Sequence, residues 1–174
     1  MWRPLIISLA VGVALSGHLP HSRAVPVAAL SKRAIEPRLR QLVGRWFVVS
    51  SSFGGPPDST SPTLVVSPVA LGRAVYSVWK QGSGVNAYEA NALWAHDSTS
   101  KQVRVFEANS VGVAETHVGA FDGTGALVLE LRNPASNGLV QRRVFRWAGD
   151  TLRMTARFLS GGRTTDRAVT LLRR

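Results

Sequence analysis

The chain has 174 residues, no cysteine and a formal net charge of +11. Its length suits one domain with a substantial hydrophobic core. The lack of cysteine excludes disulfides, a cysteine-linked lipid anchor, thiol catalysis and cysteine-ligated metals.

The charge is distributed unevenly. Residues 85–131 hold six acidic and two basic side chains, a net of −4, whereas residues 132–174 hold ten Arg and two Asp, a net of +8. In a barrel these halves form opposite walls, and a positive wall attracts anionic ligands or surfaces. The alternative, which we favour, is a solvated face with cross-strand ion pairs.

Residues 1–24 have the pattern of a secretory signal peptide. Arg3 precedes an apolar run over residues 5–17, and a polar stretch ends at Ala24. The run is shorter than the roughly 20 residues of a membrane span. We therefore expect cleavage after Ala24 (Ala29 is the second choice), export to the periplasm or outside the cell, and no stable membrane span afterwards. An uncleaved anchor is the alternative.

Residues 25–34 are predicted to be a flexible lead-in, and residues 35–174 a single barrel domain. Its first element is a short helix, because apolar residues recur at helical spacing at Ile35, Leu39, Leu42 and Val43. Pro37 is tolerated in a first turn, and Gly44 is a plausible end. Such a helix could close one end of a barrel.

Ten short strands with turn signals between them follow this helix. Their expected ranges are 46–53, 63–67, 73–80, 87–96, 102–108, 113–121, 125–132, 139–147, 152–159 and 165–173. Apolar residues alternate within them, as in Leu152, Met154, Ala156 and Phe158, which indicates walls buried on one side. The fold class is therefore all-β, an antiparallel up-and-down β-barrel of about ten strands, with a two-sheet β-sandwich as the alternative. Residues 54–62 form a candidate mouth loop.

A short helix running into Gly44-x-Trp46 resembles the opening of lipocalins and their calycin relatives. In lipocalins the Trp packs against an Arg near the end of the last strand, which implies a barrel closure by Gly44, Trp46 and Arg173 or Arg174. Residues 119–123 and 141–147 resemble an uncharacterised group of bacterial lipocalin-like barrels.

Two departures from known relatives narrow what this resemblance implies. Haem-binding barrels of the nitrobindin type continue with further glycines and supply a late histidine, but here residues 47–50 read Phe-Val-Val-Ser and no histidine follows His117. We therefore expect no haem and no other cofactor. The Thr-Asp-Tyr motif is absent, which places the chain outside the secreted lipocalins proper.

Candidate ligand-binding residues come from one strand and from scattered aromatics. Arg143 shares a face with Gln141, Phe145 and Trp147, and a guanidinium beside aromatic rings suits a ligand with an acidic head and an apolar body. The opposite face carries two valines and two arginines, so the pattern leaves the inside open, and we favour an outward Arg143. Other aromatics could line a pocket, although we favour a core role for them: Trp79, Trp94, Tyr88, Tyr76 and Phe106.

No catalytic or metal site is predicted. Glu115 and His117 share a face and could act as base and orienter, but no third ligand or nucleophile accompanies them. We interpret them as an exposed cross-strand polar pair, and His96 beside Asp97 as an ordinary turn. Basic strands with aromatics can bind single-stranded nucleic acid, but an exported protein rarely meets it, so we expect no nucleic-acid partner.

These observations predict non-catalytic binding of a small apolar or amphiphilic ligand, with an anionic head as one option, inside an exported barrel. The alternative is a structural or interaction module that acts through its basic outer wall on an anionic partner. An enzyme is the third choice.

Overall fold

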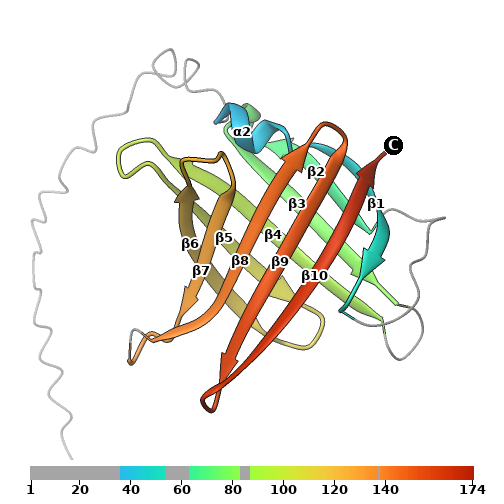
Figure 1. Ribbon diagram of the computed structural model, residues 1–174. Coiled ribbons are helices and arrows are strands. Elements are labelled where there is room, and N and C mark those ends of the chain that lie inside the picture. The colour runs from blue at the N-terminus through green and yellow to red at the C-terminus, as the bar shows by residue number, and fades with distance from the viewer. Residues whose placement is uncertain (1–35, 54–62, 83–86, 137) are drawn as a thin grey trace, which may run out of the picture. The chain divides into compact units, whose positions relative to one another are not determined.

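The structure is a computed structural model that describes residues 36–53, 63–82, 87–136 and 138–174 (Figure 1). The predicted signal peptide (1–24), the lead-in (25–34) and the candidate mouth loop (54–62) lie outside the described residues.

Ten antiparallel strands form a closed barrel, in the order β1-β10-β9-β8-β7-β6-β5-β4-β3-β2. Because β1 pairs with both β2 and β10, the sheet has no free edge. The barrel prediction is confirmed and the two-sheet sandwich is wrong. The strands are β1 (Gly44–Ser51), β2 (Leu64–Val69), β3 (Ala74–Gln81), β4 (Tyr88–Asp97), β5 (Gln102–Asn109), β6 (Ala114–Phe121), β7 (Leu127–Arg132), β8 (Leu139–Ala148), β9 (Thr151–Ser160) and β10 (Arg163–Arg173).

Two local features were not expected from the sequence. A single 3-10 turn, η1 (Ala70–Gly72), joins β2 to β3, and its Leu71 lies in the left-handed region with φ 55°. The register of β1 against β10 shifts between Val48 and Ser50. Neither a single turn nor a bulge has an apolar period that a sequence could display.

The helix α2 (Pro37–Arg40) is shorter than the predicted helix, although Leu39 and Leu42 are both fully buried as expected. Figure 1 shows α2 at the end of the barrel where β8 turns into β9. The Arg38 guanidinium lies 4.1 Å from the ring centroid of Phe121, at the end of β6. The helix therefore closes this end of the barrel.

Trp46 is the centre of this closed end. Its side chain is fully buried, and its Nε1–H donates to the carbonyl oxygen of Leu42 at 2.7 Å. Of the two candidate arginines, Arg173 lies over the Trp46 ring at 4.7 Å, whereas Arg174 lies over Phe47. Gly44 has a φ of 142°, and a Cβ there would lie 3.1 Å from Arg173 Cδ, so this position requires glycine.

The closed end is also rich in fully buried apolar side chains. Fully buried apolar side chains converge there from the helix, from the start of β3 and from the strand ends nearest α2, namely Leu39, Leu42, Trp46, Val75, Val103, Leu127, Leu152 and Leu171. The barrel is therefore filled on the helix side, and this filled layer forms the floor of the space beyond it.

Candidate functional site

Beyond that floor the barrel contains a cavity of about 600 Å³. Ligand pockets in proteins commonly range from about 300 to 1,000 Å³. Six aromatic side chains from five parts of the chain line this one: Phe53, Trp79, Tyr88, Trp94, Phe145 and Phe158. The cavity is thus large enough for a small molecule and mostly apolar.

Strand β4 shows why the space exists. Its alternate residues Tyr88, Ala90, Ala92 and Trp94 all line the cavity, while Leu93 points outward and is 40% exposed. The two alanines are buried but small, so this part of the wall leaves the interior empty where larger side chains would fill it.

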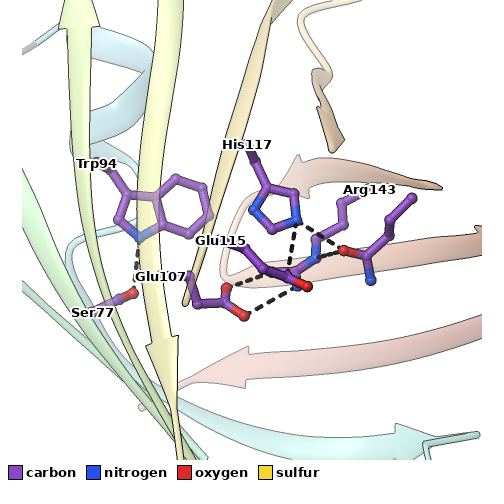
Figure 2. Close-up of polar contacts among 7 residues, drawn as sticks. Ser77, Trp94, Glu107, Glu115, His117 and Arg143 are labelled. Carbon is purple, nitrogen blue, oxygen red and sulfur yellow. Dashed lines mark hydrogen bonds and ion pairs between the residues drawn. The ribbon is translucent and has the colours of Figure 1, made fainter. Parts of the chain in front are cut away.

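Trp94 is held rigidly at the bottom of the cavity. Its Nε1–H donates to the hydroxyl oxygen of Ser77 on β3 at 2.8 Å (Figure 2). Its ring packs edge-to-face on Phe145, with centroids 5.3 Å apart and an interplanar angle of 80°. A ring fixed by both a hydrogen bond and a T-shaped contact presents a preformed wall to a ligand.

Arg143 points into the barrel, which corrects our preference for an outward side chain. Its two terminal nitrogens donate to the two carboxylate oxygens of Glu107, and the Nη2–Oε1 distance is 3.1 Å (Figure 2). The two side chains are only 16% and 8% exposed. A buried guanidinium needs such a paired, bidentate partner, and β5 supplies it from across the barrel.

Gln141 connects this ion pair to His117. Its Oε1 accepts the Nε–H of Arg143 at 3.0 Å and lies 2.8 Å from Nε2 of His117. Since an amide oxygen only accepts, the proton of His117 is assigned to Nε2. Nδ1 of the neutral ring is then an acceptor, and no described residue donates a hydrogen bond to it.

Glu115 lies directly opposite Glu107 in the pairing of β5 with β6. Its Oε2 is 3.8 Å from His117 Nε2 and 3.9 Å from Arg143 Nη2, which is too far for a hydrogen bond. Our interpretation of Glu115 and His117 as an exposed pair is wrong, because the His117 side chain is fully buried. The pair faces the interior, where two carboxylates share one guanidinium.

Burial and neighbouring charge set the ionisation of this cluster. Burial acts to raise the pKa of Glu107, but the hydrogen bonds and charge of Arg143 outweigh it, so that pKa is lowered. Burial raises the pKa of Glu115, the charge of Arg143 partly offsets this rise, and the charge of Glu107 adds to it. Burial and the charge of Arg143 lower the pKa of His117. The imidazole is therefore neutral at neutral pH, in agreement with its hydrogen bonds.

Some of the candidate ligand-binding residues line the cavity, and the others lie elsewhere in the barrel. Trp79, Tyr88, Trp94, Arg143 and Phe145 all line the cavity, while Trp94 also belongs to the hydrophobic core and Trp79 packs against it, as the favoured core role predicts. Trp147 instead packs against Phe121 at the α2 end, with ring centroids 6.1 Å apart. Tyr76 and Phe106 lie on the outer face and are 38% and 51% exposed.

Glu107, Gln141 and Ser77 were not among the candidates. Glu107 follows Val103 and Val105 on the buried face of β5, and a carboxylate that continues an apolar alternation is a signal for a buried ion pair. Gln141 shares the face of Arg143, and its importance depends on His117 from β6. Ser77 has no comparable signal in the sequence.

The outer face of β8 and β9 carries arginines in opposed pairs. Arg142 lies opposite Arg157, and Arg146 opposite Arg153. Arg157 is neutralised by Asp166 through bonds of 2.8 and 3.0 Å. The expected cross-strand ion pair is thus present in this row of the wall, whereas no described carboxylate lies within 4 Å of Arg146 or Arg153.

Within the described ranges, no helix is long and apolar enough to cross a membrane. The same part of the chain brings no three His, Asp or Glu side chains together in an arrangement suited to a metal ion.

No protein-family model matches the chain, and no curated protein matches its sequence. Among solved structures, the chain is similar to the crystal structure of Rv2717c from M. tuberculosis, with a TM-score of 0.56 over 80% of this chain and 99% of that chain. The two sequences are 21% identical, so this likeness shows the shared fold alone.

Proposed function

We propose that this protein binds a small apolar or amphiphilic ligand inside the barrel, without covalent chemistry. The observation that carries the proposal is the cavity of about 600 Å³, with its aromatic walls and a single polar cluster. A barrel that is packed at its closed end and hollow around the cavity loses packing energy. Such a loss is expected where the cavity holds a ligand.

We include in the proposal a calycin-type relationship and export. The stacking of Arg173 on Trp46 supports the relationship, and the composition of residues 1–24 supports export. Amino-terminal sequencing of the protein recovered from each fraction of its own host, the membrane fraction included, tests the second part. A mature chain that begins at Val25 is expected, and a chain that retains Met1 in the membrane fraction contradicts it.

A substitution pair on β4 tests the ligand site. Ala92 lines the cavity, whereas its neighbour Leu93 points outward. Ala92→Trp should obstruct the cavity with a bulky ring, and Leu93→Trp adds the same ring to the surface. In native mass spectrometry of protein purified from its own host, a small-molecule adduct should accompany the wild type and Leu93→Trp but be lost from Ala92→Trp. An adduct that survives equally in both variants places the ligand elsewhere.

The second candidate function is an interaction module that uses the outer arginines. It is favoured by the opposed pair Arg146 and Arg153, because like charges directly across a strand pair repel one another and an anionic partner would relieve that repulsion. Binding to vesicles that contain anionic lipid tests it. Such binding should be lost in the double variant Arg146→Gln, Arg153→Gln and be unaffected by Ala92→Trp. If the double variant binds as the wild type does, this candidate fails.

A further inference from the structure

The side-chain amide of Gln141 is held in one orientation. Its Oε1 accepts the Nε–H of Arg143 at 3.0 Å and lies 2.8 Å from Nε2 of His117. Because Nε of an arginine only donates, the atom that faces it is the oxygen of the amide, and the nitrogen occupies the other branch. These two contacts fix the amide before any ligand binds.

The amide nitrogen of Gln141 is an unused donor at the wall of the cavity. No described residue accepts a hydrogen bond from Nε2, and unlike Nδ1 of His117 this nitrogen is not completely enclosed by protein atoms. The side chain is only 4% exposed. Gln141 lines the cavity, as does Phe158, which lies opposite it on β9. The remaining surface of the amide nitrogen therefore faces the cavity.

Ser77 supplies a second unused donor, whereas the acceptors of the wall are engaged. Its Oγ accepts the Nε1–H of Trp94 at 2.8 Å (Figure 2), and no described residue accepts from its own O–H. Both carboxylate oxygens of Glu107 bind Arg143, and Oε1 of Gln141 receives two donors. A buried donor without an acceptor is unfavourable, so this wall suits a ligand that accepts hydrogen bonds.

The charges of the wall favour a neutral acceptor over an anion. Arg143 is the only cationic side chain among the described residues that line the cavity, and Glu107 neutralises it in a bidentate pair. A ligand carboxylate would have to displace Glu107, because otherwise it would meet like charge in a poorly solvated space. A carbonyl oxygen carries no net charge and needs only a free N–H group.

The surroundings of Gln141 strengthen this donor and provide a place for the rest of the ligand. The guanidinium of Arg143 bonds directly to the amide oxygen, and linked hydrogen bonds polarise one another where the surroundings are apolar. Trp94 and Phe145 line the same cavity, with their rings in edge-to-face contact. Their exposed surfaces suit the apolar body of a ligand.

We propose that the ligand presents a neutral hydrogen-bond acceptor, such as the carbonyl oxygen of a ketone, ester or amide, to the side-chain amide of Gln141, while its apolar body rests against Trp94 and Phe145. This inference rests on the proposed function, since it names the polar group of the ligand in the same cavity. It replaces the acidic head that the sequence suggested for a ligand of Arg143.

Two probes of similar size test the polar group, namely acetylnaphthalene, which has a carbonyl, and ethylnaphthalene, which has none. Each is titrated into the wild-type protein and into Gln141→Glu and compared only with itself, so that its own cost of leaving water cancels. Gln141→Glu keeps an oxygen for Arg143 and His117 but replaces the N–H groups by a second oxygen. Affinity for acetylnaphthalene should fall by roughly tenfold in this variant, while affinity for ethylnaphthalene stays nearly the same.

A matched variant and a charged probe provide the controls. Gln41→Glu makes the same substitution at an exposed position after α2, so it should change neither affinity. If acetylnaphthalene binds Gln141→Glu as tightly as it binds the wild type, the proposal is overturned. Naphthoic acid should bind the wild type more weakly than acetylnaphthalene near neutral pH, and tighter binding by the acid would also overturn it.

A measurement on the wild-type protein alone keeps the test valid if Gln141→Glu does not fold. The carbonyl carbon NMR signal of bound acetylnaphthalene should lie at or downfield of its position in water, because the oxygen still accepts a hydrogen bond. A signal moved upfield, as in an apolar solvent, would show that the carbonyl is not hydrogen-bonded and would overturn the proposal.

The outcomes separate this inference from the proposed function. If Ala92→Trp abolishes the binding of both probes, but Gln141→Glu weakens both equally or neither, the cavity is a ligand site and the role of Gln141 is wrong. If neither probe binds the wild-type protein, the cavity proposal fails and this inference fails with it.

Discussion

The two halves of the barrel use the same residue types in different ways. At the closed end, Trp46 donates to a main-chain oxygen and Arg173 covers its ring. In the hollow half, Trp94 donates to a serine hydroxyl and Arg143 pairs with Glu107. The closed end is packed with apolar side chains, whereas the other half surrounds the cavity of about 600 Å³. The difference shows that the same residue types close the barrel at one end and border its cavity at the other.

The largest expected difference between the halves concerns tryptophan. Trp46→Ala should lower the free energy of unfolding by about 3–5 kcal/mol, because it leaves a large void in a packed core. Trp79→Ala should lower it by no more than about 1 kcal/mol, because that partly exposed ring already borders empty space. Urea denaturation measures both. Equal losses would show that the two halves are packed alike.

The next largest effect concerns the inner ion pair. Glu107→Gln should destabilise the protein by about 1–3 kcal/mol, because Arg143 is left buried without its counter-charge. Asp166→Asn removes the partner of Arg157 on the outer face, where both side chains are more than half exposed, and should have a much smaller effect. The double variant Glu107→Leu, Arg143→Met should recover part of the loss. If the inner and outer variants lose equal stability, the inner pair is not effectively buried.

A pH titration of stability separates the halves further. The pKa of His117 is lowered in the folded protein. Its contribution to the free energy of unfolding is therefore fully present above its unfolded pKa of about 6.5, and it is lost as the pH falls through the lower folded value. His117→Asn should reduce this loss, by on the order of 1 kcal/mol, in denaturation curves collected across mildly acidic pH. Parallel curves for the two proteins would contradict a neutral, buried His117.

The smallest expected effect is a gain of stability rather than a loss. The pKa of Glu115 is raised on folding. Its contribution to the free energy of unfolding is therefore greatest below its unfolded pKa, and it is lost as the pH rises through the folded value. Glu115→Gln should therefore stabilise the protein at neutral pH by less than about 1 kcal/mol, while Glu130→Gln should not. A loss of stability in Glu115→Gln would indicate a structural role instead.

Much of the closed end was predictable from the sequence. Alternation and turn residues predicted the strands, and the helical spacing of Leu39 and Leu42 predicted the buried face of the helix. These signals are local, because each depends on residues only a few positions apart. The stacking of Arg173 on Trp46 was suggested by family resemblance and not by any local pattern.

The hollow half was less predictable, because its contacts join distant strands. Both faces of β8 combine arginines with apolar residues, so only the pairing of β8 with its neighbours decides that Arg143 points inward. The partner of Arg143 lies 36 positions away along the chain, on β5. In the sequence, Ala90 and Ala92 look like ordinary buried alanines. Only the three-dimensional barrel shows that they border a cavity.

The most direct test of a ligand site confined to the hollow half is an NMR titration of the tryptophan indole N–H signals. On addition of naphthylmethanol, a small amphiphilic probe, the signals of Trp79 and Trp94 should shift, while those of Trp46 and Trp147 at the closed end should stay in place. Shifts confined to Trp46 and Trp147, or no shift at any of the four indoles, would contradict the account.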